Sequence, residues 1–133
     1  SQCMVLSIQA KNQGSRWEAY FDNGREHSGR DVVEWAREGQ ARGAGELMLT
    51  SVDNEGTGKG FDLELTHSIT EEVDIPVIAS GGMGRLEHAA SAVVVGGADA
   101  VAMARVLHYG EYDVETVRKY FVEQNLPIRH SVI

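Results

Sequence analysis

Residues 75–84 read Ile-Pro-Val-Ile-Ala-Ser-Gly-Gly-Met-Gly, and this stretch decides how the chain can fold. Ile75 to Ser80 form a short apolar run typical of a buried parallel strand, with the proline near the start, where its missing N–H costs least. Three glycines follow within four positions, and a helical pattern then runs from Leu86 to Val95. This order of strand, glycine turn and helix predicts one βα unit.

The same unit recurs on both sides of this stretch. Short apolar runs predict further strands, and apolar residues spaced three and four apart predict helices between them. A small hairpin, with its turn at Asn23-Gly24, is expected to decorate the loop after the first strand. The expected strands are 3–8, 46–50, 75–80 and 98–103, the hairpin begins with 17–21, and the expected helices are 29–42, 62–72, 86–95 and 113–124.

This order predicts an α/β fold of four βα units, in which each helix returns the chain to begin another parallel strand. The first run, residues 3–8, is apolar at nearly every position, which predicts a strand buried on both faces. Two architectures fit: a (βα)4 half of a TIM (β/α)8 barrel, or an open doubly wound sheet with helices on both faces. Periodicity alone leaves both open. In either case residues 1–133 form a single domain.

Composition and charge exclude several partners. The 133 residues include 20 acidic and 12 basic side chains, a net charge of −8, and no basic cluster that would attract nucleic acid or an anionic membrane. The apolar stretches are far shorter than the roughly 20 residues of a membrane-spanning helix, so no membrane partner is expected. Cys3 is the single cysteine and allows no internal disulfide, which suits a cytoplasmic protein.

The glycine turn after the third strand is a candidate anion site. Ser80, Gly81 and Gly82 stand between a strand and a helix, where glycines let backbone N–H groups approach a phosphate and the helix dipole adds attraction. Barrel enzymes commonly build a phosphate site here together with a short extra helix, which residues 104–108 could supply. The alternative is a tight strand-to-helix turn without a ligand.

The loop between the second strand and its helix, residues 51–60, concentrates glycines and polar residues at the carboxyl edge of the sheet. It is not a calcium loop, because the alternating oxygen ligands and the distal glutamate are missing. It is not a Walker loop either, because Lys59 is followed by Gly60 rather than by serine or threonine. Asp53 and Glu55 are therefore candidates for general acid and base. The alternative is a solvated acidic loop.

The histidines give no sign of a metal centre. They stand at positions 27, 67, 88, 108 and 130, without a ligand spacing that recurs on one face. We expect His88 and His108 to be helix-surface or capping residues rather than catalytic ones. Accordingly, neither a metal nor a cofactor is expected.

Three groups of residues, agreeing in order and spacing, resemble the cyclase subunit of imidazole glycerol phosphate synthase. They are similar to the sixth strand and loop, the seventh strand and phosphate loop, and the eighth strand of that family. The likeness covers essentially the whole chain and starts at the family's fifth strand, so it implies the C-terminal half of a barrel, strands five to eight. The matching segments are 42–51 with Asp53, Gly56-Thr57 and 60–62; 76–84 with Glu87-His88; and 97–100 continuing to 106–108.

The resemblance implies a reaction of histidine biosynthesis. Ammonia from a glutaminase partner attacks a bound phosphoribulosyl nucleotide, which cyclises to imidazole glycerol phosphate and releases an aminoimidazole carboxamide nucleotide. The family substrate carries two phosphates, and this half would hold one of them. The implied phosphate and substrate contacts are Thr50, Ser51, Gly56, Thr57, Ser80, Gly81, Gly82, Ala104 and Arg105, and the implied ammonia entrance and glutaminase face include Gln2 and Glu46.

Two departures from the family pattern concern catalysis. The family uses one catalytic aspartate on its first strand, which has no counterpart here, and one on its fifth strand, where this chain has Gln9. An amide can orient a substrate by hydrogen bonding but cannot take up a proton as a carboxylate does. In addition, Glu55 stands where aspartate is more usual, and Arg105 replaces a small hydroxyl residue, where it would either contact a phosphate or crowd the site.

Three interpretations follow. In the first, the chain is the C-terminal half-barrel of this cyclase or a close paralogue; its open edges then predict association with an N-terminal half or a second copy. In the second, which Gln9 favours, it is a phosphate-binding or scaffold half-barrel without catalysis. An isomerase of the same barrel superfamily is a third interpretation, which the loop from Asp53 to Thr57 fits less well.

Overall fold

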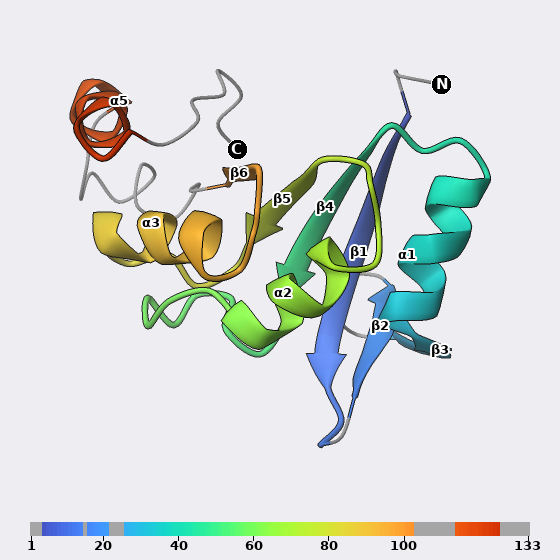
Figure 1. The fold of residues 1–133 in the computed structure, drawn as a ribbon. Coiled ribbons are helices and arrows are strands. Elements are labelled where there is room, and N and C mark those ends of the chain that lie inside the picture. Colours follow the sequence, from blue (N-terminus) through green and yellow to red (C-terminus); the bar gives the residue numbers. More distant parts are fainter. Residues whose placement is uncertain (1–3, 15, 22–25, 103–113, 126–133) are drawn as a thin grey trace.

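Six strands join into a single sheet in the order β3-β2-β1-β4-β5-β6 (Figure 1). The structure is a computed structural model, and it describes residues 4–14, 16–21, 26–102 and 114–125. The strands are β1 (Val5–Asn12), β2 (Trp17–Phe21), β3 (Glu26–Asp31), β4 (Glu46–Ser51), β5 (Val77–Ser80) and β6 (Ala100–Val101), and the helices are α1 (Val32–Ala41), α2 (Leu63–Thr70), α3 (Leu86–Val94) and α5 (Val114–Glu123).

The parallel part of the sheet is wound in one direction. β1 pairs with β4, β4 with β5 and β5 with β6, all in parallel. Right-handed crossovers that always step the same way place their helices on the same face of the sheet. The core contacts show this arrangement: α1 and α2 pack on one face of β1, β4 and β5, and α3 and α5 continue the same helical layer over β5 and β6. The described residues therefore form a mostly parallel α/β sheet consistent with part of a TIM-type barrel, and a doubly wound sheet is excluded for them.

Strand alternation gives the sheet two different faces. The face toward the helices is apolar and buried, as at Ile8 and Leu49, which are each 1% exposed. The opposite face is covered only in part: Met48, Ile78, Ala100 and Ala102 form a small cluster there. Val5 lies on the same side and is 53% exposed, so the expectation that this first strand is buried on both faces is wrong at its start.

The hairpin joins the sheet rather than decorating a loop. β2 pairs antiparallel with the carboxyl half of β1, from Gln9↔Tyr20 to Asn12↔Trp17, and β3 pairs with β2. β1 runs to Asn12 rather than ending at Ile8, because its pairing with β2 keeps the backbone extended where β4 has stopped. The expected hairpin is therefore present, and its pairing with β1 extends the parallel sheet by two antiparallel strands. The expected turn at Asn23-Gly24 lies outside the described residues.

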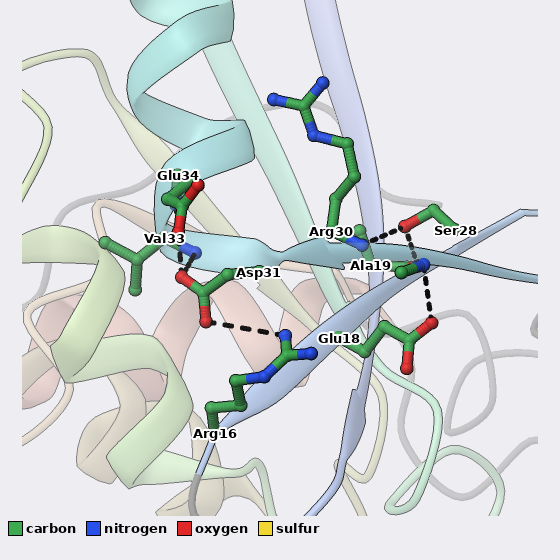
Figure 2. Close-up of polar contacts among 9 residues, drawn as sticks. Arg16, Glu18, Ala19, Ser28, Arg30, Asp31, Val33 and Glu34 are labelled. Carbon is green, nitrogen blue, oxygen red and sulfur yellow. Dashed lines mark hydrogen bonds and ion pairs between the residues drawn. The ribbon is translucent and has the colours of Figure 1, made fainter.

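Helix α1 begins at Val32 and not at Gly29, because residues before it are drawn into β3. Figure 2 shows the contacts that hold this segment extended. Gly29 donates its N–H to Oε2 of the buried Glu18 at 2.7 Å, and Arg30 donates its N–H to Ser28 Oγ at 3.0 Å. Ser28 Oγ itself donates to the Ala19 carbonyl on β2 at 2.6 Å. The contacts of Gly29 and Ser28 across the hairpin therefore override the local helical pattern.

Asp31 ends β3 and caps α1. Its Oδ2 accepts the N–H groups of Val33 at 3.1 Å and Glu34 at 3.2 Å, and its Oδ1 lies 3.8 Å from Arg16 Nη1 (Figure 2). An aspartate at this position satisfies backbone donors that the first helical turn leaves without partners. One side chain therefore both stops the strand and starts the helix.

The remaining boundaries differ from the expected ones by small amounts. α2 begins after Asp62, whose Oδ1 accepts the Leu65 N–H at 3.0 Å, and it ends at Thr70 rather than at residue 72. β5 begins at Val77 rather than at residue 75. The short helix expected at 104–108 lies outside the described residues. Within the described ranges, no helix is both long and apolar enough to cross a bilayer.

Candidate functional site

Three polar residues from neighbouring parallel strands lie in one row. Gln9 of β1 is level with Thr50 of β4, and Thr50 is level with Ser80 of β5. All three are half-buried and lie on the face opposite the helices, because Leu49 and Ala79, which alternate with them, are buried in the helix-facing core. The row stands at the carboxyl ends of the strands, where α/β proteins place their ligand sites. The fold thus brings these three predicted residues together.

Asn54 organises the loop between β4 and α2. It donates its N–H to Ser51 Oγ at 3.1 Å and its Nδ2 to the Gly60 carbonyl at 3.0 Å, while its own carbonyl accepts the Thr57 hydroxyl at 2.8 Å. Ser51 is 2% exposed on the helix-facing side, so its hydroxyl serves this turn. The sequence analysis missed Asn54, although the tendency of asparagine to bond nearby backbone groups in turns is a usable signal.

The glycine turn after β5 packs directly on this loop. Gly60 donates its N–H to the Gly82 carbonyl at 2.7 Å. Gly82 has a φ of +115°, and a Cβ placed on it would lie 2.0 Å from the Gly60 carbonyl oxygen. A Cβ on Gly84 would lie 2.1 Å from the Gly58 carbonyl oxygen. The packing of one loop on the other therefore requires these glycines by itself, whether or not an anion binds.

The two candidate acid/base carboxylates occupy different places. Asp53 Oδ2 accepts the N–H of Asn12 at 2.7 Å, which ties the loop after β4 to the end of β1. Glu55 is exposed and stays beside the turn: a Cβ on Gly81 would lie 3.4 Å from its Oε2. Asp53 thus has a structural partner, while Glu55 borders the candidate anion turn.

His88 fastens the turn to the start of α3. Its Nδ1 accepts the N–H groups of Gly84 at 3.0 Å and Arg85 at 3.1 Å, which confirms the expected capping role. Partial burial, and then the nearby Arg85 guanidinium, lower the pKa of His88, while Glu87 opposes this shift. The lowered pKa favours the neutral form of the ring, which is the form that can accept hydrogen bonds.

The other predicted site residues are dispersed. Gly56 is exposed with a φ of +78° in the loop, and Thr57 Oγ1 also accepts the Lys59 N–H at 3.2 Å. Glu46 lies at the amino end of β4, on the same face as Thr50 but at the opposite end of the strand. Gln2, Ala104 and Arg105 lie outside the described residues. In the part of the chain that the structure describes, no group of three or more His, Cys, Asp or Glu residues is placed to hold a metal ion.

Fold and site together define an α/β protein of barrel type, with polar residues and glycine loops gathered at the carboxyl ends of parallel strands. A model of the histidine biosynthesis protein family matches residues 1–113. The chain belongs to this family, within the HisA/HisF superfamily, and its function is accordingly of the histidine-biosynthesis type.

The contact between the loop after β4 and the glycine turn after β5 predicts that two glycine substitutions will lower the stability of the fold by different amounts. Gly82→Ala would force a Cβ into the Gly60 carbonyl at a positive φ, so we expect it to lower the free energy of unfolding by about 3 kcal/mol or more. Gly56→Ala also has a positive φ but meets no atom within 4 Å, and should cost only about 1 kcal/mol. Urea unfolding of both variants measures the difference, and equal losses would contradict the close approach of the two loops.

Proposed function

We propose that the chain is the C-terminal half-barrel of the cyclase subunit of imidazole glycerol phosphate synthase, or of a close paralogue, and that it binds one phosphate of a phosphorylated substrate. The observation that carries the proposal is the row of Gln9, Thr50 and Ser80 beside the two packed loops. Membership in the histidine biosynthesis family supports it.

The phosphate would bind where the row meets the turn after β5. The Ser80 and Thr50 hydroxyls lie on the open face, and Gly81 and Gly82 bring backbone close to the same place at the amino end of α3. Hydroxyl and backbone donors suit a phosphate, and the helix dipole adds to the attraction. Because the chain has a net charge of −8, binding must come from these local donors and not from the overall field.

Gln9 determines what can happen once a ligand is bound. In the family pattern this position is an aspartate that passes a proton, whereas the amide of Gln9 can only donate and accept hydrogen bonds. Gln9 would therefore orient the substrate next to Thr50. Asp53 and Glu55 remain the carboxylates available for proton transfer.

Gln9 also supports a second candidate function, in which the half-barrel binds phosphate and does not catalyse a reaction. In this form of the proposal the chain contributes one phosphate site to a larger assembly, formed with an N-terminal half-barrel, a second copy or a glutaminase. The two functions differ only in whether turnover occurs.

Phosphate binding is tested by titrating inorganic phosphate and following backbone amide resonances. We expect shifts at Gly81 and Gly82, and a roughly tenfold loss of affinity in Ser80→Ala, which removes a donor to a charged ligand. Ser7→Ala is the matched control, since Ser7 is an exposed serine on the same sheet face that is level with Met48 and not with Thr50, and it should leave affinity unchanged. Equal affinities of the two variants would overturn the placement of the phosphate.

Catalysis is tested by the variant Gln9→Asp. With an N-terminal cyclase half added, and with ammonia and the phosphoribulosyl nucleotide as substrates, we expect little or no turnover by the natural chain and measurable formation of imidazole glycerol phosphate by the variant. Gln13→Asp, in the turn after β1, is the control for a new carboxylate and should stay inactive. If Gln9→Asp gives no product although phosphate binds, the cyclase proposal fails and the binding function remains.

The exposed edge of β1 supports association. Val5 and Met4 are 53% and 52% exposed, and they border a largely apolar cavity of about 250 Å³ between β1 and α1. Among the described residues, the outer edge of β1 from Val5 to Ile8 pairs with no strand. A neighbouring βα unit would cover both features. The cavity is lined by Met4, Val5, Leu6, Trp35, Glu38, Gly39, Arg42 and Ala44.

We therefore expect the natural chain to form dimers. Val5→Asp should weaken the dimer by at least tenfold, because it would bury a carboxylate in the interface at the edge of β1. Val95→Asp, at a position 58% exposed beyond α3, is the matched control and should leave the dimer intact. Analytical ultracentrifugation over a range of concentrations measures both. A natural chain that is monomeric at all concentrations would refute self-association.

A further inference from the structure

We propose that His88 is a positioning residue that makes the turn between β5 and α3 sensitive to pH, holding its backbone in place only while the imidazole is neutral. The inference deepens the proposed phosphate site and rests on it for its consequence in binding. The conformational claim concerns the turn itself and stands on hydrogen bonds and packing.

The first step is the hydrogen-bond geometry. His88 Nδ1 lies 3.0 Å from the Gly84 nitrogen and 3.1 Å from the Arg85 nitrogen, and both of these are backbone donors. A ring nitrogen accepts hydrogen bonds only when it carries no proton, so the proton of the neutral ring is on Nε2. Protonation would turn Nδ1 into a donor that faces two other donors.

The second step is the position of His88 in the helix. Arg85 is the N-cap of α3, and its carbonyl accepts the His88 N–H at 3.0 Å. The residue three places after the N-cap usually is a glutamate or glutamine that accepts the N-cap N–H. His88 occupies this position with a ring nitrogen that stops accepting hydrogen bonds once it is protonated. A glutamine amide oxygen at the same position would accept at any pH.

The third step connects the ring to the second loop. A Cβ placed on Gly60 would lie 3.4 Å from His88 Cδ2, so the ring packs over the Gly60 backbone. Gly60 in turn donates to Gly82. The same imidazole therefore contacts both the turn that it caps and the loop on which the turn packs. If the ring moved away, the contact between Gly60 and Gly82, which borders the candidate anion site, would loosen.

The charged surroundings fix the direction of the pH effect. On its own helix, the ring has Arg85 and Glu87 nearby; on the loop side, the charged residue next to Gly60 is the exposed Lys59; and on α5, Tyr120 lies near Glu87. Burial and Arg85 lower the pKa of His88 below its ordinary value of about 6.5. The contribution of the capped turn to stability is thus fully present above that value and is lost as the pH falls through the lowered pKa.

The experiment is a pH titration of the chain by NMR between about pH 5 and 8, without phosphate. We expect the amide signals of Gly84 and Arg85 to titrate together with the His88 ring, with an apparent pKa below the ordinary histidine value of about 6.5. In His88→Gln the same amides should keep their neutral-pH positions throughout, because the amide oxygen still accepts. In His88→Ala they should be displaced at every pH.

The matched control is His67→Gln, on the exposed surface of α2, which should leave the titration of Gly84 and Arg85 unchanged. Amides that do not follow the His88 ring, or that titrate alike in the natural chain and in His88→Gln, would overturn the proposal. Inorganic phosphate added at pH 7.5 tests the proposed function separately: absence of binding with intact coupling between ring and amides refutes only the phosphate site.

Discussion

Each crossover between parallel strands of this protein advances the chain by one strand in the same direction, from β1 to β4, β5 and β6. Because such crossovers are right-handed, every helix is sent to the same face of the sheet. That constraint divides the molecule into an apolar helix-covered side and an open side. It also explains why Gln9, Thr50 and Ser80, which are distant in sequence, meet on the open side at the carboxyl ends of their strands.

The site depends on a second, local constraint, the contact between two loops at backbone distance. Gly60 and Gly82 share a 2.7 Å hydrogen bond, and glycine is needed where a Cβ would meet a carbonyl oxygen. Asn54 closes one loop from inside and His88 braces the other from α3. The same glycine turn can therefore serve both packing and the proposed phosphate site, since the packing would hold the proposed backbone donors in place before a ligand binds.

Family membership and catalysis depend on different residues. The family match extends over residues 1–113, a range that contains the six described strands and the helices α1, α2 and α3. Proton transfer depends on single side chains, and at the row of polar residues this chain has the amide of Gln9. The proposed phosphate site and the proposed turnover are therefore separable, and an amide in the row is compatible with the first without supplying the second.

The sequence by itself determined the order of strands and helices, because apolar spacing is a local property of each segment, and it also pointed to the two glycine loops through their composition. Tertiary contacts decided the rest. Glu18, Ser28 and the cap at Asp31 drew residues 29–31 out of the expected helix and into β3, and pairing with β2 lengthened β1 to Asn12. Periodicity could not show whether helices cover one face of the sheet or both, and it could not show that His88 contacts both loops. Both features depend on which distant segments become neighbours, and a local sequence pattern carries no information about that.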